Sequence, residues 1–307
     1  LKQPRLFVCK ICVSLGMIDK AQNIWRSLMP LAKCHGPWKN LKLDLPFKCH
    51  VDTARMANFN REPDTKYVFI DSEPPWAITP MDQIVANAPR YDAVMTTYNE
   101  EIVEKVPNAF YHHVRHDPYM DPSYKPGYNS KKFYVSYLVS NWRDTKSGFW
   151  IRQPATELLL SHRVPHKVWS SRRTPYPGLE LLPQTYPPHV LDDYNKTIIF
   201  DAMFSVATEN HIQKNHWQEK ILGCFWTRTV PIYFGCPNVS DFGFREDGIL
   251  RFNSVEELST ILDKITPELY YEMREAVEHN FQHTMKEYTI SQHTCIRNAI
   301  RDHFENK

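Results

Sequence analysis

The chain has 307 residues, of which 42% are hydrophobic and 23% are charged, as in ordinary globular proteins. This length is enough for two domains with a sizeable buried core. The formal net charge of +2 argues against nucleic-acid binding through a broad basic field. We predict no transmembrane segment, because the sequence has no apolar run of about 18 residues. No signal peptide is visible, and the localisation stays open between a soluble cytoplasmic enzyme and a Golgi-lumen catalytic domain whose anchor has been removed.

The sequence contains seven cysteines, an odd number, so at least one is unpaired within the chain. Cys9-Lys10-Ile11-Cys12, with Cys34-His35 and Cys49-His50, has a faint likeness to a zinc site. Cys9 and Cys12 lie within an apolar run, however, so buried free thiols are the favoured interpretation. A reducing compartment is mildly favoured, and we predict that no metal is bound.

Hydrophobic periodicity divides the chain into two halves. In the first half we expect strands at residues 5–12, 67–70 and 91–96 and helices at 17–32 and 81–87. Residues 113–129 are rich in Pro, Tyr and Gly and are interpreted as a linker and loop.

The second half alternates more regularly between strands and helices. We expect strands at 133–140, 164–170, 198–207 and 230–234, and helices at 152–160, 219–225, 255–265, most of 267–290, and 291–304. Such alternation indicates an α/β fold with a parallel sheet and helices on both faces.

The stretch from Phe204 to Phe242 carries most of the functional information. A buried strand ends in Glu209-Asn210, a polar loop follows, a helix opens near Glu219-Lys220, and an apolar strand breaks at Gly235. Open α/β sheets bind ligands at such strand ends. A helix N-terminus with a lysine beside it is also a natural seat for phosphate. The residues alone equally allow an ordinary strand-loop-helix connection with solvated charges.

This stretch resembles the donor-site signature of the α-1,3-fucosyltransferase family. The signature runs through an apolar strand, Phe-Glu-Asn, a variable loop, Thr-Glu-Lys, a helix and Val-Pro-Val/Ile-Tyr-Trp/Phe-Gly. Here it reads Ala207-Thr208-Glu209-Asn210, Gln218-Glu219-Lys220, and Val230-Pro231-Ile232-Tyr233-Phe234-Gly235. Downstream, Gly248 to Phe252 and Ser254 to Leu258 resemble the family's final strand and helix. The resemblance is strong over residues 130 to 265 and weaker before them.

Two further motifs extend the resemblance. Val139-Ser140-Asn141 and the following Arg152 resemble the family's Ser-Asn strand and its Arg-bearing helix, whose arginine contacts the donor diphosphate. A guanidinium fork suits that task because it matches phosphate oxygens bidentately. Tyr67 to Pro74 resembles the strand that ends in the general base. Glu73 is the expected base, with Asp71 as the alternative because this chain reads Ser-Glu-Pro-Pro.

The resemblance implies a GT-B glycosyltransferase, an α/β architecture of two Rossmann-like domains facing a cleft. Residues 1–135 would bind the acceptor and 136–290 the nucleotide sugar, and the helix in 291–307 could cross back to the first domain. The implied reaction is inverting transfer of L-fucose from GDP-fucose to a hydroxyl group of an acceptor glycan, with no metal or other cofactor. The expected partners are a nucleotide-sugar donor and a glycan, and no nucleic acid.

The implied donor site has a role for each matched residue. Arg152 and Lys220 would neutralise the diphosphate. Glu209 would either hold ribose or sugar hydroxyls or support its neighbours, and Asn210 would position the loop. Glu219 would either contact the sugar or orient Lys220. His216 would lie near the donor, and the list of expected donor-site residues is Arg152, Glu209, Asn210, His216, Glu219 and Lys220.

Two departures from the signature put the choice of sugar in doubt. Gln218 stands where the family has Thr, and His216 stands where it often has Tyr. The alternatives are a GT-B transferase with another sugar nucleotide, or a non-catalytic nucleotide- or carbohydrate-binding protein on the same scaffold. Two N-glycosylation-type triplets begin at Asn195 and Asn238, and such triplets arise often by chance.

Overall fold

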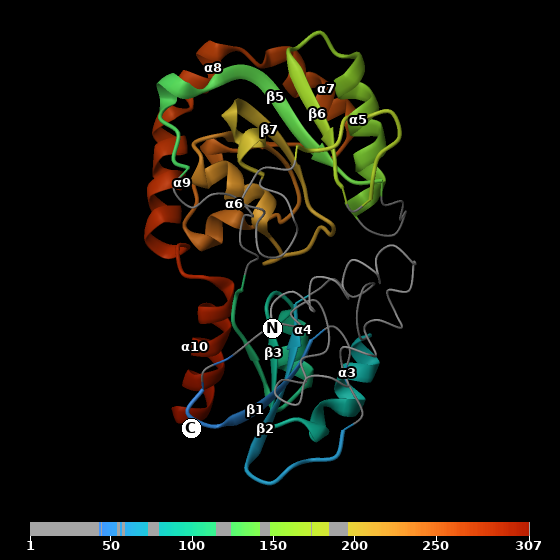
Figure 1. Ribbon diagram of the computed structural model, residues 1–307, viewed down its shortest axis with the longest axis vertical. Helices are drawn as coiled ribbons and strands as arrows, with labels where there is room; N and C mark the ends of the chain where they lie inside the picture. Colours follow the sequence, from blue (N-terminus) through green and yellow to red (C-terminus); the bar gives the residue numbers. More distant parts are fainter. Residues whose placement is uncertain are drawn as a thin grey trace, which may run out of the picture. The chain divides into compact units, whose positions relative to one another are not determined.

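The chain forms two compact units, each described here by itself (Figure 1). The computed structural model describes residues 43, 45–53, 56, 59–72, 80–114, 124–141, 148–172, 174–183 and 196–306. Unit 1 runs to Thr96 and also contains Glu101–Phe110 and the chain from Ile300 onward, and unit 2 contains Thr97–Glu100 and Tyr111–Ala299. The expected domain limits, at 135 and 290, stay predictions. The expected strand 5–12, the helix 17–32 and the expected base Glu73 lie outside the described residues.

Unit 1 is built on a four-stranded sheet in the order β1-β2-β3-β4. Its strands are β1 (Lys48–Thr53), β2 (Thr65–Asp71), β3 (Ala93–Thr96) and β4 (Ala109–Tyr111), and its helices are α3 (Met81–Asn87) and α4 (Glu100–Lys105), with a 3₁₀ turn at Ala88–Arg90. β2 is parallel to both β1 and β3. It is buried from Tyr67 to Asp71, as a strand inside a parallel sheet should be. The expected strands 67–70 and 91–96 and the helix 81–87 are confirmed.

Unit 2 is built on a five-stranded sheet in the order β6-β5-β7-β8-β9. The strands are β5 (Lys132–Val139), β6 (His166–Ser170), β7 (Ala202–Thr208), β8 (Val230–Phe234) and β9 (Leu250–Arg251). Each neighbouring pair is parallel. The helices are α5 (Arg152–Ser161), α6 (Glu219–Trp226), α7 (Val255–Lys264), α8 (Pro267–Glu272) and α9 (Arg274–Glu287), and α10 (Gln292–Glu305) ends the chain. The 3₁₀ segments are η2 (Tyr128–Ser130), η3 (Gly148–Ile151), η4 (Lys196–Asp201), η5 (Val239–Phe242) and η6 (Glu246–Gly248).

Alternate residues of these strands feed two cores on opposite faces of the sheet. On one face Val206 and Ile232 pack in a cluster that also holds Leu159 of α5 and Leu258 of α7. On the other face Ala207 and Tyr233 pack in a cluster with Ile221, Leu222 and Phe225, which all come from α6. The two-residue repeat of a strand produces this division. Helices therefore cover both faces, and the α/β class predicted from the sequence is confirmed (Figure 1).

The predicted start of one strand lies before the start seen in the structure. The apolar run Ile198–Phe200 was expected to start a strand that ends at Ala207, but η4 covers Lys196–Asp201 and β7 starts at Ala202. The first residue pair between β5 and β7 is Lys132 with Ala202, and Lys132 is the first residue of β5. If β7 began before Ala202, its earlier residues would therefore have no β5 residue to pair with. A short apolar run does not distinguish a strand from a buried helical turn.

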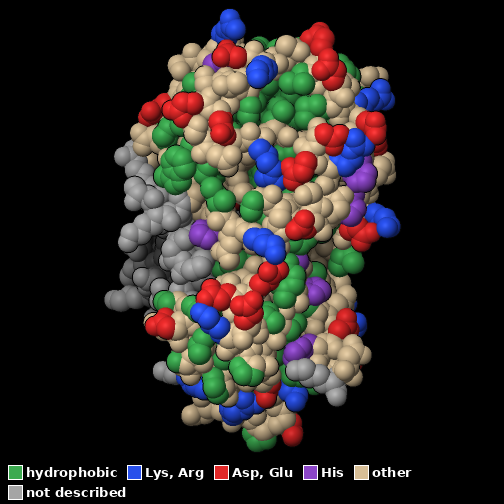
Figure 2. Space-filling view, turned by 180° about the vertical axis from the view of Figure 1, so that it is seen from behind, with side chains coloured by type: hydrophobic (Ala, Val, Ile, Leu, Met, Phe, Trp, Pro, Cys, Tyr) green, Lys and Arg blue, Asp and Glu red, His purple; other side chains and the backbone are tan. Residues whose placement is uncertain are grey.

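The surface gives little direction about partners. Within the described chain, no helix is long and apolar enough to cross a bilayer. Figure 2 shows basic and acidic side chains intermixed over much of one face. This intermixing agrees with the small net charge of the sequence.

Candidate functional site

The predicted donor-site residues of unit 2 gather where β5 and β7 end. β5 leads through α5 to β6 on one side of it, whereas β7 leads through α6 to β8 on the other side. The strand order therefore reverses between β5 and β7, and doubly wound sheets bind ligands at such a switch point, outside the carboxyl ends of the strands. Ser140 follows β5 directly, and Glu209 and Asn210 follow β7.

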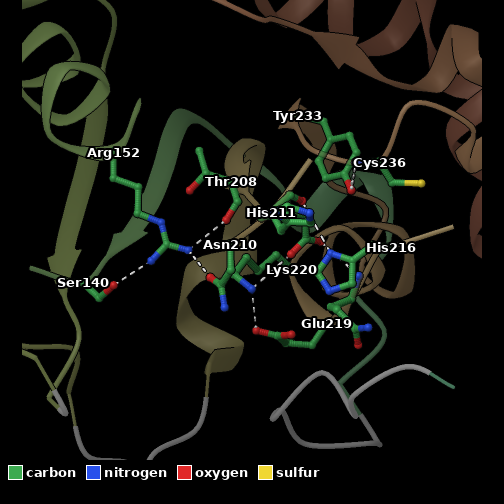
Figure 3. Close-up of polar contacts among 12 residues, drawn as sticks. Ser140, Arg152, Thr208, Asn210, His211, His216, Glu219, Lys220, Tyr233 and Cys236 are labelled. Atoms are coloured by element: carbon green, nitrogen blue, oxygen red, sulfur yellow. Dashed lines mark hydrogen bonds and ion pairs between the residues drawn. The ribbon is translucent and has the colours of Figure 1, made fainter. Parts of the chain in front are cut away.

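Arg152 is the first residue of α5 and reaches across this point (Figure 3). Its Nη1 donates to Ser140 Oγ at 2.7 Å, and its Nη2 donates to Asn210 Oδ1 at 2.5 Å and to the Thr208 carbonyl oxygen at 3.3 Å. The guanidinium also lies over the Phe149 ring, with Cζ 4.1 Å from the ring centroid. Arg152 thereby bridges the ends of the two strands that flank the switch point.

The guanidinium of Arg152 is a buried charge without a matching carboxylate among the described residues. The residue is 6% exposed, and within the described chain no acidic side chain forms an ion pair with it and no acceptor lies near its Nε. Burial lowers the pKa of Arg152, although the nearby Tyr137, Glu209 and Glu219 oppose that shift. An arginine side chain still stays protonated at neutral pH. A buried charge of this kind is costly unless a partner compensates it.

Glu209 lies beside Arg152 but is committed to other groups. It is fully buried, its Oε1 accepts from the Gln218 backbone N–H at 3.0 Å, and its Oε2 accepts from Lys220 Nζ at 3.2 Å. Gln218 is the residue before α6, so this carboxylate occupies part of the anion-binding end of the helix. Both carboxylate oxygens of Glu209 are therefore already hydrogen-bonded, and its role in a donor site stays a prediction.

Lys220 is held between two carboxylates. Its Nζ lies 3.2 Å from Glu209 Oε2 and 3.0 Å from Glu219 Oε1, and its side chain is 26% exposed. Burial alone would lower the pKa of Lys220, but the charges of Glu209 and Glu219 outweigh that effect and raise it. The ammonium is therefore charged at neutral pH and fixed in place, with part of its surface accessible.

Two glycines let the backbone approach the Glu209-Asn210 turn. A Cβ at Gly148 would lie 2.6 Å from the Glu209 carbonyl oxygen, and Gly148 N donates to the Asn210 carbonyl oxygen at 2.7 Å. A Cβ at Gly235 would lie 2.6 Å from Glu209 Cγ and 2.5 Å from Tyr233 Oη. The backbone contact of Gly148 gives Asn210 the loop-fixing geometry expected of it, in addition to its bond with Arg152.

His216 and Gln218, the two departures from the signature, are both buried. His216 Nδ1 lies 3.5 Å from the His211 carbonyl oxygen, and its ring packs edge-on against Tyr98 with the centroids 5.0 Å apart. Gln218 is 6% exposed, and its side chain does not cap α6. Gln218 directly precedes Glu219 in the chain, and His216 stands two residues before Gln218.

The alternative general base, Asp71, lies at the end of β2 in unit 1. It is 1% exposed, and its Oδ2 accepts from Thr96 Oγ1 at 3.2 Å. The structure thus gives Asp71 a packed, hydrogen-bonded environment at a strand end. Among the described residues, no group of three or more His, Cys, Asp and Glu side chains could hold a metal ion. The metal-free mechanism stays a prediction.

A pocket of unit 2 adds Lys196, a residue to which the sequence analysis gave no role in the donor site. Its walls include Leu138 of β5, the end of β7, Lys196 and Phe200 of η4, and both Glu219 and Lys220 of α6. Lys196 is 9% exposed, and its Nζ lies 3.5 Å from Glu219 Oε1. No periodic pattern links residues 196 and 219, so only the folded chain shows that they meet.

The comparisons with known proteins show similarity in fold. No protein-family model and no curated protein matches the chain. A crystal structure of TarM is similar over 83% of this chain and 54% of TarM, with 10% identity and a TM-score of 0.52. A crystal structure of α1,3-fucosyltransferase is similar over 84% of this chain and 78% of its own, with 14% identity and a TM-score of 0.47. An α-glucosyltransferase in complex with UDP-glucose and DNA containing an abasic site has the same identity and TM-score over 84% of this chain and 80% of its own.

These findings establish the architecture of the chain. The similarity to TarM shows a shared fold over most of this sequence. Together with the two parallel sheets and their helices, it confirms the predicted α/β, GT-B type of architecture with two Rossmann-like domains. The activity does not follow from a likeness at such low identity.

Proposed function

We propose that this chain is a glycosyltransferase that takes its sugar from a nucleotide-sugar donor. The observation that carries the proposal is the buried guanidinium of Arg152 at the switch point of the unit 2 sheet, with no carboxylate partner among the described residues and no acceptor near its Nε. A diphosphate supplies what this group lacks, because its oxygens accept charge-assisted hydrogen bonds in the bidentate geometry of a guanidinium.

Lys220 would supply the second positive charge. Its ammonium is fixed by Glu209 and Glu219 and is partly accessible, so it can meet a phosphate oxygen without reorganising. Glu209 then acts through Lys220 and the start of α6, because both of its oxygens are already hydrogen-bonded. Two preorganised cations also stabilise the charge that develops on the leaving diphosphate, which is the task a metal ion performs in other transferases.

The specific reaction that we propose is inverting transfer of L-fucose from GDP-fucose to a glycan hydroxyl. The acceptor oxygen attacks the anomeric carbon, the bond from that carbon to the diphosphate breaks, and the hydroxyl proton passes to a carboxylate. We assign the carboxylate to Glu73, with Asp71 as the alternative. Base catalysis of this kind contributes about 10²–10⁴-fold, and the positioning of both substrates contributes the rest.

A second donor class is favoured by the same part of the chain. His216 and Gln218 depart from the fucosyltransferase signature, and both are buried next to Glu219 and Lys220. A change of side chain near the donor alters which sugar or base fits, whereas the two cations would accept any nucleoside diphosphate. The first alternative to a fucosyltransferase is therefore a transferase for another sugar nucleotide. The second alternative is a non-catalytic nucleotide-binding protein.

The test combines binding with turnover. Calorimetric titration of GDP and UDP separates the donor classes, and hydrolysis of GDP-fucose, GDP-mannose and UDP-galactose is followed with and without EDTA. Each measurement is repeated on Lys220→Ala and on the control Lys132→Ala, whose side chain is 66% exposed at the start of β5. We expect turnover of GDP-fucose that is insensitive to EDTA, lost in Lys220→Ala and kept in the control.

The other outcomes decide between the alternatives. Tight UDP binding with turnover of UDP-galactose would establish a transferase for another donor. Tight GDP binding without turnover, even when a glycan mixture is supplied, would favour the non-catalytic protein. A chain that binds neither nucleotide would contradict the proposal as a whole.

A further inference from the structure

Four charged side chains of unit 2 follow one another with alternating sign, and three of them line the pocket. Glu209 contacts Lys220, Lys220 contacts Glu219, and Glu219 contacts Lys196, with N–O distances of 3.2, 3.0 and 3.5 Å. The two lysines approach the same oxygen, Glu219 Oε1, although one comes from η4 and the other from α6. Both lysines and Glu219 line the pocket.

The charge of this group of residues depends on Lys196. When Arg152 is included, Arg152 and Lys220 balance Glu209 and Glu219, so the formal charges of those four side chains sum to zero. Lys196 adds one positive charge, and its own side chain is 11% exposed. Ion pairs this deeply buried contribute little net stability, because the cost of desolvation offsets the attraction. A binding role for the additional lysine accounts for its burial in the wall of a pocket.

We propose that Lys196 is a further anion-binding residue of the donor site, where it and Lys220 together contact the diphosphate of the nucleotide. This rests on the proposed function for the nature of the ligand. Both ammonium groups lie within 3.5 Å of Glu219 Oε1 at the pocket wall, which also includes the apolar residues Leu138, Ile199 and Phe200. An anion that enters the pocket meets two lysines that are already placed, which lowers the entropic cost of binding.

The experiment compares three probes on four proteins. The probes are GDP, inorganic pyrophosphate and guanosine, and the proteins are wild type, Lys196→Met, Lys196→Arg and the surface control Lys132→Met. We expect Lys196→Met to bind GDP and pyrophosphate about tenfold more weakly, since a hydrogen bond to a charged group is lost, and to bind guanosine as wild type does. Lys196→Arg should recover most of the loss, and the control should match wild type.

The salt dependence of GDP binding is a second measurement. It would not change if Lys196 had only a structural role. The dependence of GDP affinity on ionic strength should be shallower in Lys196→Met than in wild type, because one charge no longer acts on the ligand. Thermal unfolding of each variant shows whether it is folded, and Lys196→Gln replaces Lys196→Met if the latter is not.

The outcomes separate this inference from the proposed function. If wild type binds GDP and Lys196→Met binds it equally well, or loses GDP and guanosine to the same extent, Lys196 is not an anion contact and the proposed function is untouched. If wild type binds pyrophosphate through Lys196 but neither GDP nor UDP, the nucleotide-sugar function is wrong and the anion site remains. If wild type binds neither pyrophosphate nor either nucleoside diphosphate, GDP or UDP, both are wrong.

Discussion

The two edges of the unit 2 sheet each hold a buried cation, and the two cations differ in their hydrogen-bond partners. At the carboxyl edge, Arg152 links the ends of β5 and β7. At the amino edge, Lys131 precedes β5 and donates to the Phe200 carbonyl oxygen at 2.5 Å and to Thr229 Oγ1 at 2.6 Å, just before β7 and β8 begin. Both residues are 6% exposed. Within the described chain, neither forms an ion pair with a carboxylate.

The difference lies in how completely the protein satisfies each cation. Lys131 is held by neutral acceptors, and burial lowers its pKa from 10.5 to about 7, so it can give up its proton near neutral pH. Arg152 cannot lose its charge, and its Nε is left without an acceptor among the described residues. A lysine can link strand ends as a neutral amine, whereas a permanently charged arginine suits the anionic ligand that we propose.

Replacing Arg152 tests the carboxyl edge and should have the largest effect. We expect Arg152→Met to weaken GDP binding about a hundredfold, which corresponds to the loss of a bidentate charge-assisted contact. Arg152→Lys should recover only part of it, because a single ammonium cannot reproduce the fork. Titration calorimetry gives the affinities. If Arg152→Met is less stable but binds GDP like wild type, the prediction is wrong. Arg152 would then have a purely structural role, like Lys131.

Replacing Lys131 tests the amino edge through pH. Because the folded-state pKa lies below the unfolded value, the unfolded chain binds more protons between pH 7 and about 10.5, and stability rises with pH over that window. From pH 7 to pH 9 the contribution of Lys131 should change by about 2 kcal/mol. Lys131→Met should lack this rise in denaturant titrations at the two pH values.

The exposed Lys132 provides the matched control for that measurement. Lys132→Met should keep the wild-type pH dependence of stability, because the Lys132 side chain is 66% exposed. GDP affinity at pH 7 should be the same in both variants, since Lys131 lies at the edge opposite the proposed site. Equal pH profiles for wild type and Lys131→Met would contradict the assigned environment of Lys131.

Replacing Glu209 should have the smallest of the three effects. Glu209→Ala removes the acceptor for Gln218 N–H and one of the two carboxylates that hold Lys220, so we expect GDP affinity to fall about tenfold. Glu209→Gln keeps an acceptor for the helix N–H and should lie between the alanine variant and wild type. If Glu209→Gln were as weak as Glu209→Ala, the charge of Glu209 rather than its hydrogen bond to α6 would be what matters.

The sequence predicted the parts of this fold that have long, regular patterns. β7, β8 and α6 follow from apolar runs that end at Glu209, Gly235 and the Glu219-Lys220 pair, and α7 and α9 follow from helical spacing. The short elements β1, β4 and α4 did not, because segments of three to six residues are too short to show a clear period. The start of β7 was misplaced because a buried 3₁₀ turn and a buried strand look alike in sequence.

The sequence predicts a list of candidate site residues, whose roles stay predictions, but it does not predict the contacts among them. The order of motifs brought Arg152, Asn210 and Lys220 to one edge, as parallel strands require. The partners of each charge depend on contacts between distant residues, such as Lys196 with Glu219 and Lys131 with Thr229. No local pattern encodes those contacts. The role of Glu73 stays a prediction.

The close approach of Gly148 and Gly235 to the Glu209-Asn210 turn has a consequence for engineering. Any side chain at these two positions would press on the turn, so a mutant library aimed at new donors gains nothing by varying them. His216 and Gln218 contribute side chains rather than backbone clearance, and they lie just before the two charged residues of α6. If the proposed function is right, a library confined to those two codons would vary the preference for the donor without changing Arg152, Glu209, Asn210 or Lys220.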